Sequence, residues 1–183
     1  MKINWVLSNT VVIDPTINLD DLKNIGPLWG GWRTWRSYST DNVVCHDISQ
    51  AMKLVNNNFH TRCNLHLPAA AYQELGRPTG VKLYQGEFNQ LIDNPDDIVS
   101  MHLASTVGDI VLLLGFDLSD VSSTDKLQIH KRHNYKNYFR QIINDSSNVQ
   151  WVLLDQLPNI DPEFKKVSNL QFDTLNNVLL QLN

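Results

Sequence analysis

Cysteine is scarce in this sequence, with two residues in 183. Two cysteines can form one bridge at most, so the chain is not a disulfide-rich scaffold. No apolar run approaches the roughly 20 residues that cross a bilayer, and the start of the chain lacks the apolar core of a signal peptide. We therefore expect a soluble, cytoplasmic protein with no membrane attachment.

Positive charge is also in short supply. The 15 lysines and arginines stand against 19 aspartates and glutamates, which gives a formal net charge of -4. Proteins that bind nucleic acids usually carry a basic domain or stripe, so this balance argues against a nucleic acid as partner. The 8 glycines form neither a G-x-G-x-x-G fingerprint nor a P-loop, which removes the usual support for dinucleotide or Walker-type nucleotide binding.

Apolar residues, in contrast, are plentiful. They make up 42% of the chain and charged residues only 19%, a balance typical of folded proteins. A chain of this length can bury a substantial core but is too short for two ordinary domains. We predict one α/β domain over residues 1–183.

Several short apolar runs predict buried strands. Continuous β-branched or leucine-rich runs are typical of parallel strands that are covered on both faces. The clearest runs are residues 43–46, 109–114 and 149–154, and weaker ones are residues 5–13, 63–67 and 81–84. The expected sheet therefore has about six strands.

Helix signals alternate with these strands. Asp47, with Gln50 three places on, forms a capping box before apolar residues at helical spacing. Asn94 and Pro95, followed by acidic residues, mark a second helix start, and amphipathic stripes predict helices around residues 135–143 and 175–182. The alternation predicts a three-layer, Rossmann-like α/β sandwich with a mostly parallel sheet.

In such a sheet, ligands bind beyond the carboxyl ends of the strands. Three polar residues follow predicted strands: His46, Asp117 and Asp155. We expect them on one rim, with His46 and Asp117 as acid–base groups and Asp155 as a ligand contact. The structural alternative is that the two aspartates only end strands and begin turns. Asp47 is expected to cap a helix rather than to act as an acid.

Residues 26–38 (GPLWGGWRTWRSY) are the most unusual stretch of the chain. Trp29, Trp32 and Trp35 could stack on a base or sugar, and Arg33 and Arg36 could hold a phosphate. Trp is also a burial residue, and arginines on a buried segment often reach out to water. The sequence therefore offers a ligand-binding interpretation and a packing interpretation of the same segment.

Two further clusters favour structural interpretations. Cys45–His46 and the Cys63–His66 pair have zinc-ligand chemistry, but their spacing in a strand points the side chains to opposite faces. We expect no metal site there. Arg132, Lys136 and Arg140 recur every four residues, which predicts a solvated helix face, with phosphate contact as the alternative. His130 is expected in a loop before that helix.

Residues 110–119 (IVLLLGFDLS) resemble the strand and turn of Rossmann-like proteins related to 6-hydroxymethylpterin diphosphokinase and to flagellin-modifying glycosyltransferases. In those proteins the turn carries an Asp near the ligand pocket, so the resemblance implies a ligand-pocket position for Asp117. The glycine-rich N-terminal motif of that group is absent here. The whole chain is also similar to compact proteins encoded by marine tailed phages, which would place it in the host cytoplasm.

These observations lead to a functional hypothesis and an alternative. We expect binding of a nucleotide or another phosphorylated metabolite at the carboxyl rim of the sheet, and group transfer as the reaction class if the protein is an enzyme. The residues identify no cofactor. The alternative is a non-catalytic phage accessory or assembly protein that uses residues 26–38 to contact a protein partner or a second copy of the chain.

Overall fold

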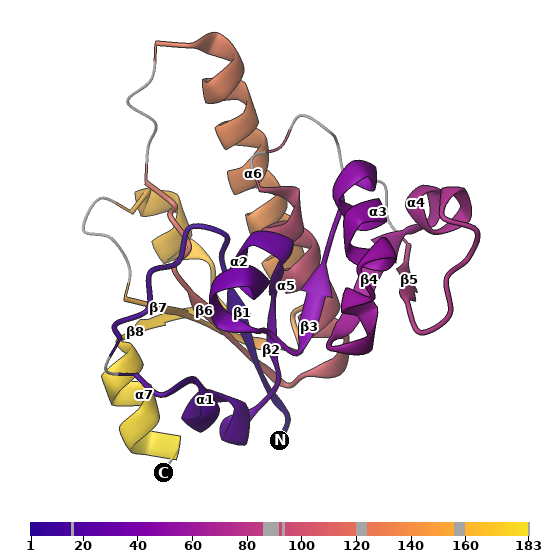
Figure 1. The fold of residues 1–183 in the computed structure, drawn as a ribbon. Coiled ribbons are helices and arrows are strands. Elements are labelled where there is room, and N and C mark those ends of the chain that lie inside the picture. Colours follow the sequence, from indigo (N-terminus) through magenta and orange to yellow (C-terminus); the bar gives the residue numbers. More distant parts are fainter. Residues whose placement is uncertain (16, 86–91, 93, 120–123, 156–159, 183) are drawn as a thin grey trace.

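A single sheet of parallel strands runs through the protein (Figure 1). The computed structural model describes residues 1–15, 17–85, 92, 94–119, 124–155 and 160–182. The strands are β1 (Ile3–Leu7), β2 (Leu28–Gly31), β3 (Asn42–Val44), β4 (Asn64–Pro68), β5 (Lys82–Tyr84), β6 (Ile110–Leu114), β7 (Gln150–Leu154) and β8 (Leu170–Asp173). Their order across the sheet is β5-β4-β3-β2-β1-β6-β7-β8.

Helices connect the strands. They are α1 (Leu19–Ile25), α2 (Trp32–Tyr38), α3 (Ile48–Asn56), α4 (Ala69–Glu74), α5 (Pro95–Val107), α6 (Lys126–Asp145) and α7 (Leu175–Leu182), with 3-10 turns at Phe59–Thr61 and Pro162–Lys166. No helix in the described part of the chain is long and apolar enough to cross a membrane.

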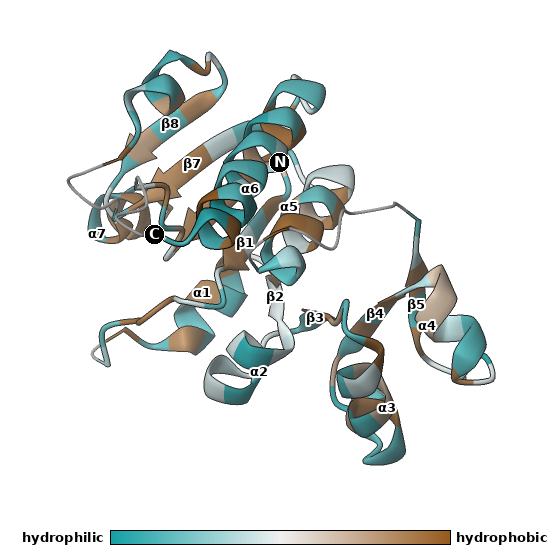
Figure 2. Cartoon of the chain, turned by 90° about the horizontal axis from the view of Figure 1, so that it is seen from above, coloured by the Kyte–Doolittle hydropathy of each residue, from teal (hydrophilic) through white to brown (hydrophobic). Residues whose placement is uncertain are grey.

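The helices cover both faces of the sheet, so the predicted three-layer α/β sandwich is confirmed. Figure 2 shows α5 and α6 on one side of the strands and α1 and α2 on the other. Beneath α5 and α6, Val6, Leu113 and Trp151 belong to one buried apolar cluster. On the opposite face, Trp5 and Leu7 belong to a second cluster that α1 and α7 complete. Side chains alternate between these clusters along each strand because successive residues of a strand point to opposite faces.

The sheet has eight strands rather than the expected six, and every described pair is parallel. The additional strands are β2 and β8. β2 lies inside residues 26–38 and contains two glycines, and β8 alternates polar and apolar residues, so neither resembles a long buried run. Both pair with a longer neighbour that supplies the register.

The strand order reverses at β1. The chain adds β2 to β5 on one side of β1, and α5 then crosses back over the sheet so that β6 pairs with the other side of β1. Ile3 lies opposite Ile110 in that pairing. The carboxyl ends of β1 and β6 therefore diverge into loops on opposite sides, which is the switch point where ligands bind in open parallel sheets.

The cap residues act as the sequence predicts in α3. Asp47 accepts a hydrogen bond from the Gln50 backbone N–H at 2.8 Å. In α6, however, the cap is Asp125, and the helix starts at Lys126. The prediction of a loop at His130 is therefore wrong, because Asp125 caps the helix well before the apolar stripe begins.

The stripe of Arg132, Lys136 and Arg140 is not a solvated face. Lys136 is only 7% exposed, and its ammonium lies 3.3 Å from the Asp161 carboxylate. The Arg132 guanidinium pairs with Asp117, and that of Arg140 lies over the ring of Phe164. These contacts hold the segment after β6 and the 3-10 turn after β7 against α6.

Replacing a core leucine of the central sheet should strongly destabilise the fold. Leu153→Ala removes a fully buried side chain of β7, and we expect the free energy of unfolding to fall by about 2–5 kcal/mol. Leu180→Ala in α7 is the matched control, since that side chain is 81% exposed, and its effect should stay within about 0.5 kcal/mol. Urea unfolding of both variants measures the difference, and equal losses would contradict the assigned core.

Candidate functional site

Two cavities lie along the carboxyl edge of the sheet. The first, about 600 Å³, lies beyond β2 and β3, and we name it the α2–α3 cavity. Its lining residues are Asn9, Trp32, Arg33, Cys45, His46, Asp47, Ile48, Ser49, Gln50, Asn94, Pro95 and Asp96. The second, about 430 Å³, lies beyond β1 and β6, and we name it the switch-point cavity. Its lining residues are Ser8, Thr10, Val11, Val12, Asn94, Leu114, Gly115, Phe116, Asp117, Arg132, Tyr135 and Asp155.

The start of α5 forms the wall between the two cavities. Asn94, just before this helix, lines both of them. The end of β2 packs directly against the helix start, because a Cβ on Gly31 would lie 2.8 Å from the Asp96 Cβ. Gly31 is therefore required by close approach rather than by its backbone conformation.

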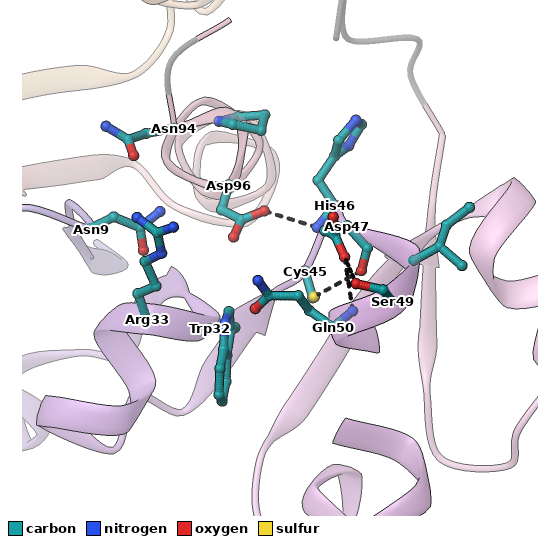
Figure 3. A pocket seen from close by; sticks show the side chains of 12 residues that line it. Asn9, Trp32, Arg33, Cys45, His46, Asp47, Ser49, Gln50, Asn94 and Asp96 are labelled. Atoms are coloured by element: carbon teal, nitrogen blue, oxygen red, sulfur yellow. Dashed lines mark hydrogen bonds between the residues drawn. The ribbon is translucent and has the colours of Figure 1, made fainter. Parts of the chain in front are cut away.

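Asp96 ties the loop after β3 to α5. Its carboxylate accepts a hydrogen bond from the His46 backbone N–H at 2.8 Å (Figure 3). Burial raises the pKa of this carboxyl to about 6, and the bond from His46 and the nearby charge of Arg33 oppose the shift. Near neutral pH, the protonated fraction of Asp96 is therefore larger than that of an ordinary aspartate.

Asp97 ties the loop after β1 to the same helix. It is fully buried, and its two carboxylate oxygens accept hydrogen bonds at 2.8 Å from Ser8 Oγ and from the Asn9 backbone N–H. The side chain of Tyr135 also hydrogen-bonds this carboxyl group. Burial raises the pKa of Asp97 to about 7 despite these bonds.

His46 stands at the rim of the α2–α3 cavity, and its Nδ1 lies 2.9 Å from the Tyr84 hydroxyl. Burial lowers the pKa of the imidazole, so the neutral ring predominates at pH 7. Asp47 next to it holds Ser49 Oγ and the Gln50 N–H, and these bonds lower its pKa. Burial raises the pKa of the Cys45 thiol well above its usual range, so Cys45 is a poor nucleophile.

In the switch-point cavity, an ion pair fixes the turn after β6. Arg132 lies 2.9 Å from the Asp117 carboxylate and also donates to the Asp117 backbone carbonyl. The same carboxylate accepts bonds from the backbone and hydroxyl of Ser119, which keep its pKa below the usual range against the opposing effect of burial. Asp155 is exposed and has a left-handed backbone (φ 48°), and one of its oxygens caps the Leu175 N–H at 3.2 Å.

The structure brings some of the predicted site residues together and separates others. Trp32, Arg33 and His46 share the α2–α3 cavity, whereas Asp117 and Asp155 line the switch-point cavity. All five lie at the predicted carboxyl rim. These five residues lie in two separate cavities because β3, which precedes His46, lies three places from β6 across the sheet, while β6 and β7, which precede Asp117 and Asp155, are neighbours.

The other three predicted ligand contacts line neither cavity. Trp29 is 5% exposed, and its indole N–H donates to Asn4 Oδ1 at 3.1 Å. The Trp35 ring packs edge-on against Phe59. The Arg36 guanidinium lies over the Trp32 ring, 5.2 Å from its centroid. Trp29 and Trp35 thus have the packing role that the sequence offered as an alternative.

Sequence reasoning missed Ser8, Asn9, Asp96 and Asp97. The two aspartates looked like ordinary acidic residues in a first helical turn, where they favour the helix dipole. The sequence gives no signal for them, because neighbouring residues project about 100° apart around a helix and two acids in a first turn can both face water on a helix that is covered on one side only. The partners of these acids come from loops far away in the chain, which spacing does not reveal.

Among the residues that the structure describes, no three or more His, Cys, Asp or Glu side chains gather as a metal-binding group. The strand order and the position of the cavities define a doubly wound, Rossmann-like α/β protein with its candidate site at the carboxyl rim. Comparison of the chain with protein-family models, with curated proteins and with solved structures finds no match.

The burial of Asp97 should make the protein less stable as pH rises. The folded-state pKa of about 7 lies above the ordinary value of 3.8. The stability gained by binding this proton in the folded state is therefore fully present below about pH 4 and is lost as the pH rises through about 7. At about 1.4 kcal/mol per pKa unit, the loss is on the order of a few kcal/mol. Asp97→Asn should flatten the profile of unfolding free energy against pH, leaving the smaller slope of Asp96.

Asp20→Asn is the control, because Asp20 is an exposed aspartate in the first turn of α1. Urea unfolding across this pH range gives the three profiles. Parallel profiles for the wild type and Asp97→Asn would refute the raised pKa.

Proposed function

We propose that the protein binds a nucleotide or another phosphorylated small molecule in the α2–α3 cavity and transfers a group from it. The observation that carries the proposal is the convergence of Trp32, Arg33 and His46, from the ends of two neighbouring strands, on one cavity at the carboxyl rim. Its volume of about 600 Å³ falls within the range of small-molecule sites. Ligands of open parallel sheets bind at this edge.

Arg33 supports the phosphate part of the proposal. It is exposed, makes no ion pair with a described residue, and is the sole lysine or arginine among the cavity's lining residues. Figure 3 shows its side chain beside Asn9, directed toward the start of α5. A guanidinium binds phosphate oxygens through two parallel hydrogen bonds. A single arginine, with Asp47 and Asp96 nearby, favours a ligand with one phosphate over a triphosphate.

Polar groups across the cavity support a sugar next to that phosphate. Gln50 Oε1 is a buried atom with no hydrogen-bond partner among the described residues. Ser49 and Asn9 also line the cavity. Amide and hydroxyl groups of this kind suit ligand hydroxyls, and a ligand hydroxyl would satisfy the carbonyl of Gln50.

His46 is the acid–base candidate in this cavity. In the tautomer whose Nδ1–H donates to the Tyr84 hydroxyl oxygen, 2.9 Å away, the ring is held in place and Nε2 is the unprotonated nitrogen that is left for a ligand. A neutral imidazole at pH 7 can accept a proton from an attacking group. Trp29 is buried and the half-buried Trp35 packs against Phe59, so neither indole is free for a partner, which counts against a protein-interaction surface at residues 26–38.

Removing the Arg33 guanidinium should selectively weaken phosphate binding. Titration calorimetry of the full chain uses UMP, AMP, ribose 5-phosphate and glucose 1-phosphate as probes. Loss of a charge-assisted contact of about 1.5–3 kcal/mol predicts that Arg33→Ala weakens the best probe by roughly ten- to a hundredfold. Arg36→Ala is the matched control, one turn along α2 and outside both cavities, and should change the affinity less than about threefold.

Two results would count against the proposal. One is that none of the four probes binds to the wild-type chain. The other is that Arg33→Ala binds the best probe as tightly as the wild type does. If Arg33→Ala and Arg36→Ala weaken binding of the best probe equally, Arg36 also contacts the phosphate.

A further inference from the structure

Asp96 and Arg33 face the same open space in the α2–α3 cavity. Both residues line this cavity, and neither is fully buried. The charge of Arg33 acts on the Asp96 carboxyl, because it opposes the rise in the pKa of that group. No ion pair joins the two side chains among the described contacts. A cation and a carboxyl group therefore border one cavity without closing on each other.

The Asp96 carboxylate has acceptor capacity to spare. Its Oδ1 accepts the His46 backbone N–H at 2.8 Å, and the Trp32 backbone N–H also bonds the carboxyl group. The two oxygens of an ionised carboxylate offer about four lone-pair sites, so these bonds leave about half of them free. Figure 3 shows the second Asp96 oxygen directed toward the side of the cavity where Arg33 and Trp32 lie. A ligand in the cavity can therefore donate a hydrogen bond to Asp96.

The charges around Asp96 disfavour a fully ionised ligand. The titratable and charged groups that face it come from several elements: Arg33 of α2, Cys45, His46 and Asp47 after β3, Tyr84 of β5 and Asp97 of α5. Burial keeps the thiol, the imidazole and the phenol neutral near pH 7. Arg33 is thus the one positive charge among the cavity's lining residues, against Asp47 and ionised Asp96. An oxyanion without a proton adds to this negative charge and is repelled.

An oxyanion that carries a proton fits the same arrangement. Its ionised oxygens accept N–H groups from Arg33, and its O–H donates to Asp96, so a charge-assisted hydrogen bond replaces the repulsion. The amides of Asn9 and Asn94 also line the cavity and can donate to the remaining oxygens. A phosphate group holds such a proton near neutral pH, since the second pKa of a phosphomonoester is about 6. Sulfate, sulfate esters and phosphodiesters hold none.

We propose that Asp96 selects a phosphate group that carries a proton by accepting that proton, while Arg33 holds the ionised oxygens, so that the α2–α3 cavity discriminates against sulfate. This inference rests on the proposed function for the place of the phosphate, and it names the chemical form that the site takes. Inorganic phosphate and a phosphomonoester can both supply this group. Asp96 touches the ligand and determines its specificity.

The test compares two tetrahedral dianions of the same shape. At about pH 8, inorganic phosphate is a dianion with one proton, and sulfate is a dianion with none. NMR titration of the ¹⁵N-labelled full chain with each ion follows the amide signals of Trp32, Arg33 and His46. Phosphate should bind at least about tenfold more tightly than sulfate at this pH, because only phosphate donates to ionised Asp96.

Lowering the pH should remove this preference. Burial raises the pKa of Asp96 to about 6, so at about pH 5 the carboxyl carries its own proton and can donate it to sulfate. Sulfate affinity should therefore rise by about tenfold per pH unit as the pH falls from about 8 to about 6. At about pH 5, the preference for phosphate should fall below about threefold or reverse.

Two aspartates of the cavity provide a matched pair of variants. Asp96→Asn keeps an oxygen for the His46 N–H, and its amide donates to either ion, so phosphate and sulfate should bind alike at pH 8. Asp47→Asn removes the same charge from the same cavity, and Asn also caps a helix well. It should change the affinity for both ions equally and keep the preference for phosphate. The wild-type comparison across pH tests the inference even if Asp96→Asn fails to fold.

Proton uptake distinguishes the two sources of the phosphate group. At pH 8 a phosphomonoester has lost the proton that its pKa of about 6 governs, so ribose 5-phosphate should take up about one proton as it binds. Inorganic phosphate brings its proton and should take up none. Calorimetry in buffers of different ionisation enthalpy measures the uptake, and an uptake near zero for ribose 5-phosphate contradicts the inference. The probe that binds more tightly at pH 8 identifies the source.

The outcomes distinguish this inference from the proposed function. Equal binding of phosphate and sulfate at pH 8, an unchanged preference in Asp96→Asn, or no binding of either ion overturns the inference. If both ions bind equally and Arg33→Ala weakens both, the proposed function stands without selection by Asp96. If inorganic phosphate binds with the expected preference while none of the four phosphorylated probes binds, the proposed function fails and the phosphate site stands.

Discussion

The return of α5 across the sheet is the constraint on which the rest of the molecule depends. After β5 the chain must return past β4, β3, β2 and β1 before β6 can pair, and α5, which packs on β1, β2 and β3, starts at the carboxyl rim. Its first turn therefore faces the ends of β1, β2 and β3 together. Backbone N–H groups of these loops need acceptors in a buried setting, and Asp96 and Asp97 supply them. The same two carboxylates thereby fix the shape of both cavities.

This arrangement joins stability to the chemistry of the site. Buried carboxylates oppose folding unless hydrogen bonds compensate for their lost hydration, and the two aspartates retain raised pKa values even with such bonds. The fold thus holds titratable groups near neutrality at the place where ligands of parallel sheets bind. A hydrophobic replacement would pack without this cost but would leave the loop N–H groups unpaired.

Most of the architecture could be predicted from the sequence, because buried runs and caps act locally. The α3 cap at Asp47 and the strands around residues 110–114 and 150–154 are examples. The site was predicted less completely. His46 and Arg33 were identified because they follow strands or stand out in composition, whereas Asp97 gains its environment from Ser8, 89 positions away. Likewise, the basic stripe of α6 looked solvated because its acidic partners come from other segments. Long-range pairing of polar groups leaves no periodic pattern in a sequence.

The pairing of β1 with β6 also governs how the chain can fold. Ile3 and Ile110 are partners, so the central strand has one open edge until more than half of the chain has been made. Contacts this distant in sequence slow folding, because a long loop must close before they form. An unpaired parallel edge at the centre of the sheet is also a surface on which another chain can add a strand. During synthesis from the N-terminus, β1 at the centre of the sheet is therefore made first. Its open edge stays available to other chains until β6 has been made and pairs with it.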